Sequence, residues 1–218
     1  MKEKHLSYFA VLDSFNSKEC PVCFLVKKRI EKYFDDLLYE NVNDISFRKE
    51  FLKNCGFCNY HSYKFLSYND GLAVSLTHRD LVVDWIKRLK AGSIKYSLRK
   101  KLIDANCIVC RLAKEAEERY ISIIIKYLDD EEFKSKFLLS EGLCIPHYEI
   151  LLTKMKAPPR WFSDFHVKRY EEILSKLDRY LDSCNFSLGE KRPALANDEE
   201  LIWKKVVKML FGFEGKLK

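Results

Sequence analysis

One pattern of cysteine and histidine residues occurs twice in the 218-residue chain, and it restricts the fold more than any other feature of the sequence. Each copy has a Cys-x-x-Cys pair followed by a Cys-x-x-His pair, with 34 residues (24–57) between the pairs in the first copy and 33 (111–143) in the second. Structural zinc takes four thiolate or imidazole ligands at tetrahedral corners, and short paired motifs of this kind supply them. The sequence therefore predicts metal binding.

The near-equal spacing predicts that each copy builds one site from its own two pairs, because the residues between them have room for a helical hairpin that folds back on itself. Two zinc ions are the expected cofactors. Four protein ligands per ion leave no open coordination position, which is typical of structural rather than catalytic zinc. No catalytic residue is predicted, and a role in binding or scaffolding is favoured over catalysis. The predicted ligand sets are Cys20, Cys23, Cys58 and His61 in the first site and Cys107, Cys110, Cys144 and His147 in the second.

The two copies of the motif belong to a longer internal repeat. When Cys20 is aligned with Cys107, further identical residues match at an offset of 87 and, after a one-residue deletion, of 86. The matched pairs include Lys27 with Lys114, Glu31 with Glu118, Phe51 with Phe137 and Gly56 with Gly142. The alignment divides the chain into an N-terminal segment (1–18), a first metal-binding repeat (19–91), a basic linker (92–104), a second metal-binding repeat (105–182), and a loop with a C-terminal helix (183–218).

The predicted fold class is all-α. Apolar residues recur at three- and four-residue steps, and 7 Gly and 5 Pro are few for a turn-rich chain. Each repeat is expected to begin with a long helix at its Cys pair, where the helix N-terminus favours thiolate over thiol. A shorter helix follows, capped by Asn43 or Asp44, or by Asp129 or Asp130, and Gly56 or Gly142 ends it at positive φ. The predicted long helices span about 22–40, 72–90, 108–128, 159–181 and 199–211, and Asn197 or Asp198 opens the last. Phe47, Phe51 and Leu52, or Phe133, Phe137 and Leu138, form the apolar stripe of the shorter helix, and the Cys-x-x-His opens a third helix that continues through Phe65 or Leu151.

Other uses of the same cysteines stay open. Three Cys and one His could hold an iron–sulfur cluster instead of zinc. The Cys20-Pro-Val-Cys23 segment is also similar to the dithiol of thioredoxin-like proteins, although no strand is predicted before it. Buried cysteines that bind nothing are a further alternative. Cys55 is aligned with Glu141 and Cys184 lies outside the alignment, so neither is a predicted ligand. His5, His78 and His166 have no counterpart in the repeat and are not predicted ligands.

A basic segment joins the two repeats. Between Trp85 and Lys101 there are seven basic residues and no acidic ones, with Tyr96 between them. Such a segment could neutralise phosphates and stack on bases, although basic linkers are more often only solvated. Nucleic-acid binding is therefore an alternative function. The residues predicted to carry it are Lys87, Arg88, Lys95, Arg99, Lys100 and Lys101.

The sequence favours a cytoplasmic location. No apolar stretch approaches the roughly 20 residues of a membrane-spanning helix. The segment from Met1 to Asn16 lacks the apolar core of a secretory signal. Cysteines in such a chain are expected to be reduced. The net charge of +7 comes from 39 basic and 32 acidic side chains and so does not identify a partner, which could be a protein or a nucleic acid; membrane association is not expected.

The chain resembles a bacterial and archaeal family of uncharacterised proteins, the domain-of-unknown-function 6062 family. The resemblance covers nearly the whole length. It rests on Cys20-Pro-Val-Cys23, on Gly56-Phe57-Cys58-Asn59-Tyr60-His61, on Cys107-Ile108-Val109-Cys110, and on Gly142-Leu143-Cys144-Ile145-Pro146-His147. The third motif lacks the Cys-Pro start that is usual in the family, which affects the rigidity of the turn more than the ligands. The resemblance strengthens the motif and implies no particular activity.

Overall fold

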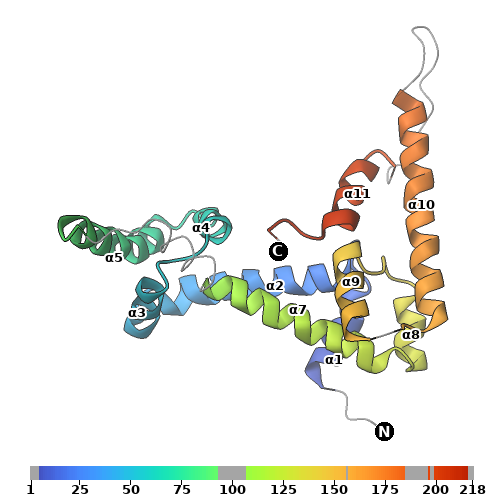
Figure 1. Cartoon of the computed structure of the whole chain (residues 1–218), viewed down its shortest axis with the longest axis horizontal. Coiled ribbons are helices and arrows are strands. Elements are labelled where there is room, and N and C mark those ends of the chain that lie inside the picture. The colour runs from blue at the N-terminus through green and yellow to red at the C-terminus, as the bar shows by residue number, and fades with distance from the viewer. Residues whose placement is uncertain (1–4, 93–106, 156, 185–195, 197–198, 216–218) are drawn as a thin grey trace. The chain divides into compact units, whose positions relative to one another are not determined.

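A computed structural model describes the chain except for residues 1–4, 93–106, 156, 185–195, 197–198 and 216–218. The described residues form helices and contain no strand, which confirms the predicted all-α class (Figure 1). None of these helices is both long enough and apolar enough to cross a membrane. The helices are α1 (Leu6–Ser14), α2 (Pro21–Asp36), α3 (Ile45–Lys53), α4 (Asn59–Leu66), α5 (Gly71–Lys90), α7 (Ile108–Tyr127), α8 (Glu131–Phe137), α9 (Ile145–Lys154), α10 (Arg160–Cys184) and α11 (Ile202–Phe211), and a π-helical turn, η1 (Leu37–Asn41), extends α2.

The chain forms two compact units, each built from residues far apart in the sequence. The terminal unit comprises residues 1–25 with 117–216, and the central unit comprises residues 26–116. The two long helices α2 and α7 cross the boundary between these ranges. Each unit therefore contains the beginning of one long helix and the end of the other.

The terminal unit contains a helix that was not predicted. The N-terminal segment forms α1, and Tyr8, Val11 and Leu12 are buried at the steps expected for one face of a helix. The ring of Tyr8 packs against those of Tyr127 and Phe133, with centroids 4.6 and 6.0 Å away. A nine-residue helix without a side-chain cap has weak sequence signals at its ends, so tertiary packing stabilises it.

The short helices begin at two of the predicted caps. The side chain of Asp44 accepts a hydrogen bond from the Phe47 backbone N–H at 2.8 Å, and Asp130 accepts the corresponding bond from Phe133 at 2.9 Å. Each carboxylate satisfies a backbone donor that the first turn of a helix leaves unpaired. Asp44 and Asp130, rather than Asn43 and Asp129, are therefore the caps.

The two predicted helix-ending glycines have positive φ, 90° at Gly56 and 72° at Gly142. After α3, however, Cys55 already occupies the left-handed position that follows the cap, at φ 58°. The Gly56 N–H donates to the Phe51 carbonyl at 2.8 Å, as in a Schellman motif. A Cβ on Gly56 would lie 2.9 Å from Leu81 Cδ1, and one on Gly142 would lie 3.0 Å from Phe165 Cε1. The close approach of α5 to Gly56, and of α10 to Gly142, is thus a second reason for glycine at these positions.

The C-terminal helix begins three residues later than predicted, at Ile202 instead of Glu199. The side chain of Glu199 accepts a hydrogen bond from the Ala196 backbone N–H at 3.1 Å and forms an ion pair with Arg179 of α10. These contacts attach the residues just before α11 to α10. Helix α11 packs on α9 and α10 within the terminal unit. The expected caps Asn197 and Asp198, most of the loop predicted before the C-terminal helix and most of the basic linker lie outside the described residues.

Candidate metal centres

The structure brings all eight predicted ligands together, but in exchanged pairs. Each group takes its Cys-x-x-Cys from one repeat and its Cys-x-x-His from the other, and the four ligand atoms of each group lie within 4.8 Å of one another. The prediction that each repeat closes its own site is therefore wrong. The terminal centre consists of Cys20, Cys23, Cys144 and His147, and the central centre consists of Cys58, His61, Cys107 and Cys110.

Helix lengths explain why the pairs are exchanged. Helix α2 and η1 together cover residues 21–41, about 30 Å at 1.5 Å per residue, and carry the chain away from Cys20. The return helix α3 has 9 residues, which span only about 14 Å. Helix α3 alone therefore does not return the chain to Cys20. The same imbalance separates Cys107 from Cys144, because α7 has 20 residues and α8 has 7.

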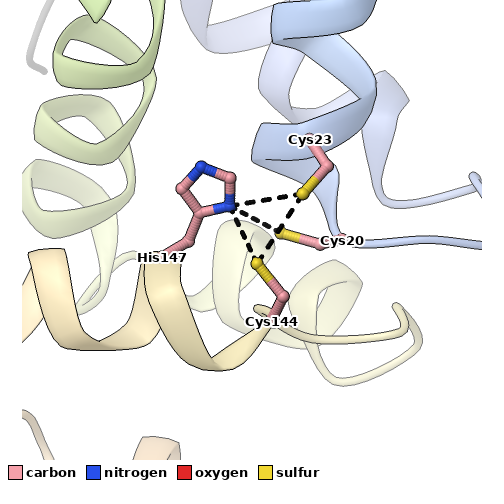
Figure 2. A group of neighbouring side chains, drawn as sticks. All are labelled: Cys20, Cys23, Cys144 and His147. Atoms are coloured by element: carbon pink, nitrogen blue, oxygen red, sulfur yellow. Dashed lines mark hydrogen bonds between the residues drawn. The ribbon is translucent and has the colours of Figure 1, made fainter. Parts of the chain in front are cut away.

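The terminal centre is compact and buried. Figure 2 shows its four side chains pointing toward one another, with His147 Nδ1 facing the three sulfurs. This nitrogen lies 3.0 Å from Cys144 Sγ and 3.4 Å from both Cys20 Sγ and Cys23 Sγ. Zinc bonds of about 2.0–2.3 Å place tetrahedral ligands about 3.3–3.8 Å apart. The separations, including 3.6 Å between Cys23 Sγ and Cys144 Sγ, suit four ligands around one ion.

The central centre has the same donors in a similar arrangement. His61 Nδ1 lies 3.2 Å from Cys58 Sγ, 3.3 Å from Cys110 Sγ and 3.6 Å from Cys107 Sγ. The sulfurs of Cys58 and Cys110 are 3.5 Å apart, far beyond the roughly 2.05 Å of a disulfide. Three of the four residues are buried, whereas Cys58 is only half-buried. Like Cys144 in the terminal centre, Cys58 occupies the N-cap position of the helix that carries its histidine, without a side-chain capping hydrogen bond.

The electrostatics of both groups favour a cation. Burial opposes ionisation of Cys20, but hydrogen bonds with Cys144 and Cys23 and the charge of His147 outweigh it and hold the pKa of Cys20 well below its usual range. Hydrogen bonding to Cys144 and Cys20, with burial, raises the pKa of Cys23. Without a cation, therefore, one thiolate forms and its neighbour keeps its proton. A divalent ion supplies the positive charge that allows all three sulfurs to ionise.

The histidines respond to the same thiolates. Burial lowers the pKa of His147, but the charge of Cys20 and hydrogen bonds to Cys144 and Cys20 reverse this and raise it to about 11. At His61, burial acts in the same direction, and hydrogen bonds with Cys107 and Cys58 raise the pKa to about 9. The sulfurs thus favour a positive charge at each imidazole. A metal ion bound to the imidazole nitrogen would supply that charge in place of the proton. The eight-residue set fits two single-ion Cys3His centres.

A glutamate completes the terminal centre. His147 Nε2 lies 2.7 Å from Glu117 Oε1, on α7. A metal-binding imidazole commonly donates its second N–H to a carboxylate, which fixes the ring and its tautomer. Sequence reasoning missed Glu117. Its signal was a change of residue type in the repeat, since the aligned position is Ile30.

The central centre lacks this arrangement. His61 Nε2 is buried and has no hydrogen-bond partner among the described residues. The aligned residue Ile30 is 5% exposed and lies one helical turn before Phe34, whose ring centroid is 6.5 Å from that of His61. An apolar side chain thus occupies the place in the sequence where the other repeat has a carboxylate.

Two histidines outside the centres correspond to each other, contrary to the expectation that they lack counterparts. His78 Nδ1 lies 2.9 Å from the Val74 carbonyl, and His166 Nδ1 lies 2.7 Å from the Phe162 carbonyl, each four residues earlier. Their rings are both 5.7 Å from a phenylalanine, Phe51 or Phe137. Residues inserted before α10 change the offset to 88 and hide the match. Neither belongs to a ligand group, nor do Cys55, Cys184 and His5.

His166 connects α10 to the terminal centre. Its Nε2 accepts the Leu143 backbone N–H at 2.9 Å, so Nδ1 carries the proton and donates it to the Phe162 carbonyl. Burial lowers the pKa of His166 to about 4. The neutral imidazole therefore fixes the backbone next to the ligand Cys144. A cavity of 40 Å³ lies between this segment and α11, near Cys20, Tyr170 and Lys205, and has room for only a few water molecules.

The residues predicted to contact nucleic acid are described only in part. Lys87 and Arg88 lie exposed in the last turn of α5. Arg88 Nε donates to Asp84 at 2.6 Å, which partly neutralises its charge. Lys95, Arg99, Lys100 and Lys101 lie outside the described residues.

Comparisons with known proteins give a family without an assigned role. A family profile described as "Family of unknown function (DUF6062)" matches residues 1–183. A relative from Caldicellulosiruptor sp. (strain Rt8B.4), "Uncharacterized 23.9 kDa protein in xynA 3'region", is 29% identical over 176 residues, which cover 79% of this chain and 80% of the relative. No solved structure matches the chain.

Proposed function

This chain belongs to the DUF6062 family, and we propose that it is a structural zinc protein that acts as a binding or scaffolding module. In this proposal each Cys3His centre holds one zinc ion, and the two ions fasten helices that the sequence places far apart. The observation that carries the proposal is the convergence of four donors within 4.8 Å at each of two places. Four protein ligands close each centre, which favours a structural role over catalysis.

The geometry supports a single ion over a cluster. The four protein ligands of a [4Fe–4S] cluster each bind a different iron atom, and those of a [2Fe–2S] cluster are divided between two, so either set spreads farther apart than four ligands that share one ion. Burial also disfavours thiol exchange, since Cys20 is 9% and Cys107 is 1% exposed and an exchanging thiol must reach its partner. None of the eight cysteines forms a disulfide in the structure, and we propose a reducing compartment such as the cytoplasm, which would keep the ligand sulfurs available for metal.

The zinc ions would connect distant parts of the chain. Cys20 and His147 are 127 positions apart, and His61 and Cys107 are 46 apart. A metal that joins such positions restricts the unfolded chain and couples its own binding to folding. We further propose that segments 19–91 and 105–182 are copies of one ancestral module, because their ligands and caps correspond and His78 corresponds to His166.

Elemental analysis and an absorption spectrum of anaerobically purified protein test this function. We expect about two equivalents of zinc and no visible absorption. Cys58→Ser and Cys144→Ser should each remove about one equivalent, whereas Cys184→Ser, an exposed thiol outside both centres, should remove none. A brown protein with iron and sulfide would establish the cluster instead, and a metal-free folded protein would overturn the proposal.

A second candidate function is partner binding through the end of α5. Val82, Ile86 and Leu89 are 56%, 45% and 55% exposed there, beside the exposed Lys87 and Lys90. An apolar stripe flanked by lysines could contact an acidic protein or a nucleic acid. Titration of the protein with mixed-sequence DNA and RNA at low and high salt distinguishes these partners. Loss of salt-dependent binding in Lys87→Ala/Lys90→Ala would support a nucleic acid, and no binding at low salt would exclude it.

A further inference from the structure

The two centres differ in what surrounds the second ring nitrogen, Nε2, of their histidines. We propose that the terminal centre holds its metal firmly, whereas the central centre exchanges it and makes the central unit the metal-responsive half of the protein. The inference rests on the proposed function, because it requires that both centres bind metal. It concerns the relative affinity and lability of the centres, which their identical donor sets do not by themselves distinguish.

The first argument is the tautomer that each metal-bound histidine must adopt. In both centres Nδ1 faces the sulfurs, so a metal ion would bind Nδ1 and the proton would reside on Nε2. In the terminal centre that N–H donates to Glu117 at 2.7 Å. The carboxylate fixes the ring in its binding orientation and makes Nδ1 a stronger donor.

In the central centre the same tautomer leaves a donor with no acceptor among the residues that the structure describes. His61 Nε2 is buried without a partner there, and the aligned residue Ile30 cannot accept a hydrogen bond. A buried N–H that lacks an acceptor disfavours the state that requires it. Metal binding at His61 therefore stabilises the central centre less than metal binding at His147 stabilises the terminal centre.

The second argument is access. Cys144 is 3% exposed, whereas its counterpart Cys58 is half-buried. The two repeats also differ three residues before these cysteines, where the terminal unit has Glu141 and the central unit has Cys55. Glu141 pairs with Lys205 of α11 at 2.6 Å, so the C-terminal helix is fastened beside the terminal centre. The central unit has the half-buried thiol of Cys55 at that position. A chelator or a competing thiol can thus approach the central ligands more readily.

Release of zinc to 4-(2-pyridylazo)resorcinol, followed by absorbance on protein loaded with two equivalents, tests the proposal. We expect two phases of equal amplitude, with the faster at least tenfold quicker. Cys58→Ser should abolish the fast phase and Cys144→Ser the slow one. A single phase for both ions, or loss of the fast phase in Cys144→Ser, would overturn the proposal. Failure to load any zinc would instead refute the proposed function itself.

Reciprocal variants test the cause. Glu117→Gln should accelerate the slow phase about 10- to 100-fold, as loss of such partners usually weakens metal binding by that factor. Glu118→Gln, an exposed neighbour on the same helix, is the matched control and should change nothing. Ile30→Glu should slow the fast phase, with Ile30→Gln as a second variant should the charge prevent folding, as judged by circular dichroism. Unchanged release in Glu117→Gln would show that the carboxylate does not control retention.

Discussion

The terminal and central units contain the same donor set but surround it differently. In the terminal centre every ligand is buried, and a carboxylate stands behind the histidine. In the central centre one cysteine is half-buried, and no described residue pairs with the second nitrogen of the imidazole. Ligand identity alone therefore does not determine a metal site. The residues that touch the ligands decide how strongly the site depends on its metal.

The largest expected effect is the loss of one ligand. Cys144→Ser should lower the free energy of unfolding by on the order of 5 kcal/mol, because binding of a structural metal is coupled to folding. Cys58→Ser should cost less, since its centre holds metal less firmly. Thermal denaturation of the zinc-loaded proteins measures both, with Cys184→Ser as the control. A greater loss in Cys58→Ser would reverse the comparison.

The next effect is a pH dependence specific to the terminal unit. The folded-state pKa of His166 is about 4, below its ordinary value of 6.5. As pH falls below 6.5, His166 binds a proton in the unfolded chain but not in the folded chain. The stability that the neutral His166 contributes is therefore complete above pH 6.5 and is lost by about pH 4. The expected loss is on the order of 3 kcal/mol.

Urea denaturation at several pH values, on wild type and on His166→Phe, isolates this contribution. Protonation of the metal ligands destabilises both proteins at low pH, so the difference between their slopes reports His166. We expect the variant to be less stable at pH 7 and less sensitive to pH between 6.5 and 4. Parallel curves for the two proteins would show that His166 does not titrate in this range.

Substitution of the two glycines compares the packing beside each centre. Gly142→Ala should cost about 1–3 kcal/mol, because φ is positive and the new Cβ would meet the rings of Phe165 and His166. Gly56→Ala should cost less, because its nearest neighbour is the end of a flexible Leu81 side chain. Denaturant midpoints of the two variants measure the difference. Equal costs would mean that strain in φ, rather than the neighbouring rings, dominates at both positions.

The smallest expected effect is at a helix cap. Asp130→Ala removes the acceptor for the Phe133 N–H and should cost about 1 kcal/mol. Asp130→Asn keeps an acceptor and should restore most of the stability. A loss well above this value in Asp130→Ala would indicate that the start of α8 also supports the terminal centre. Calorimetry of the two variants distinguishes these outcomes.

Local features of the sequence predicted much of the structure. Apolar periodicity predicted the helix class and the long helices, and the caps Asp44 and Asp130 were among the predicted pairs. The Cys and His spacing indicated the ligands, although not which pairs meet. That grouping depends on the lengths of α2 and α3 relative to each other, so the spacing between motifs could not reveal it. Glu117 and the match of His78 with His166 were missed because they depend on tertiary contacts and on an offset altered by inserted residues.

The exchange of ligand pairs has an evolutionary consequence. Neither repeat joins its own Cys-x-x-Cys to its own Cys-x-x-His in this structure, so a solitary copy in the same conformation would not complete a centre. Two identical copies could complete both centres if the Cys-x-x-Cys of each copy met the Cys-x-x-His of the other, as in a symmetric, domain-swapped dimer. Under the proposed duplication, the tandem chain would have the ligand connectivity of such a dimer joined into one polypeptide. The two halves of such a chain can diverge, and the pair Glu117 and Ile30 would be an example.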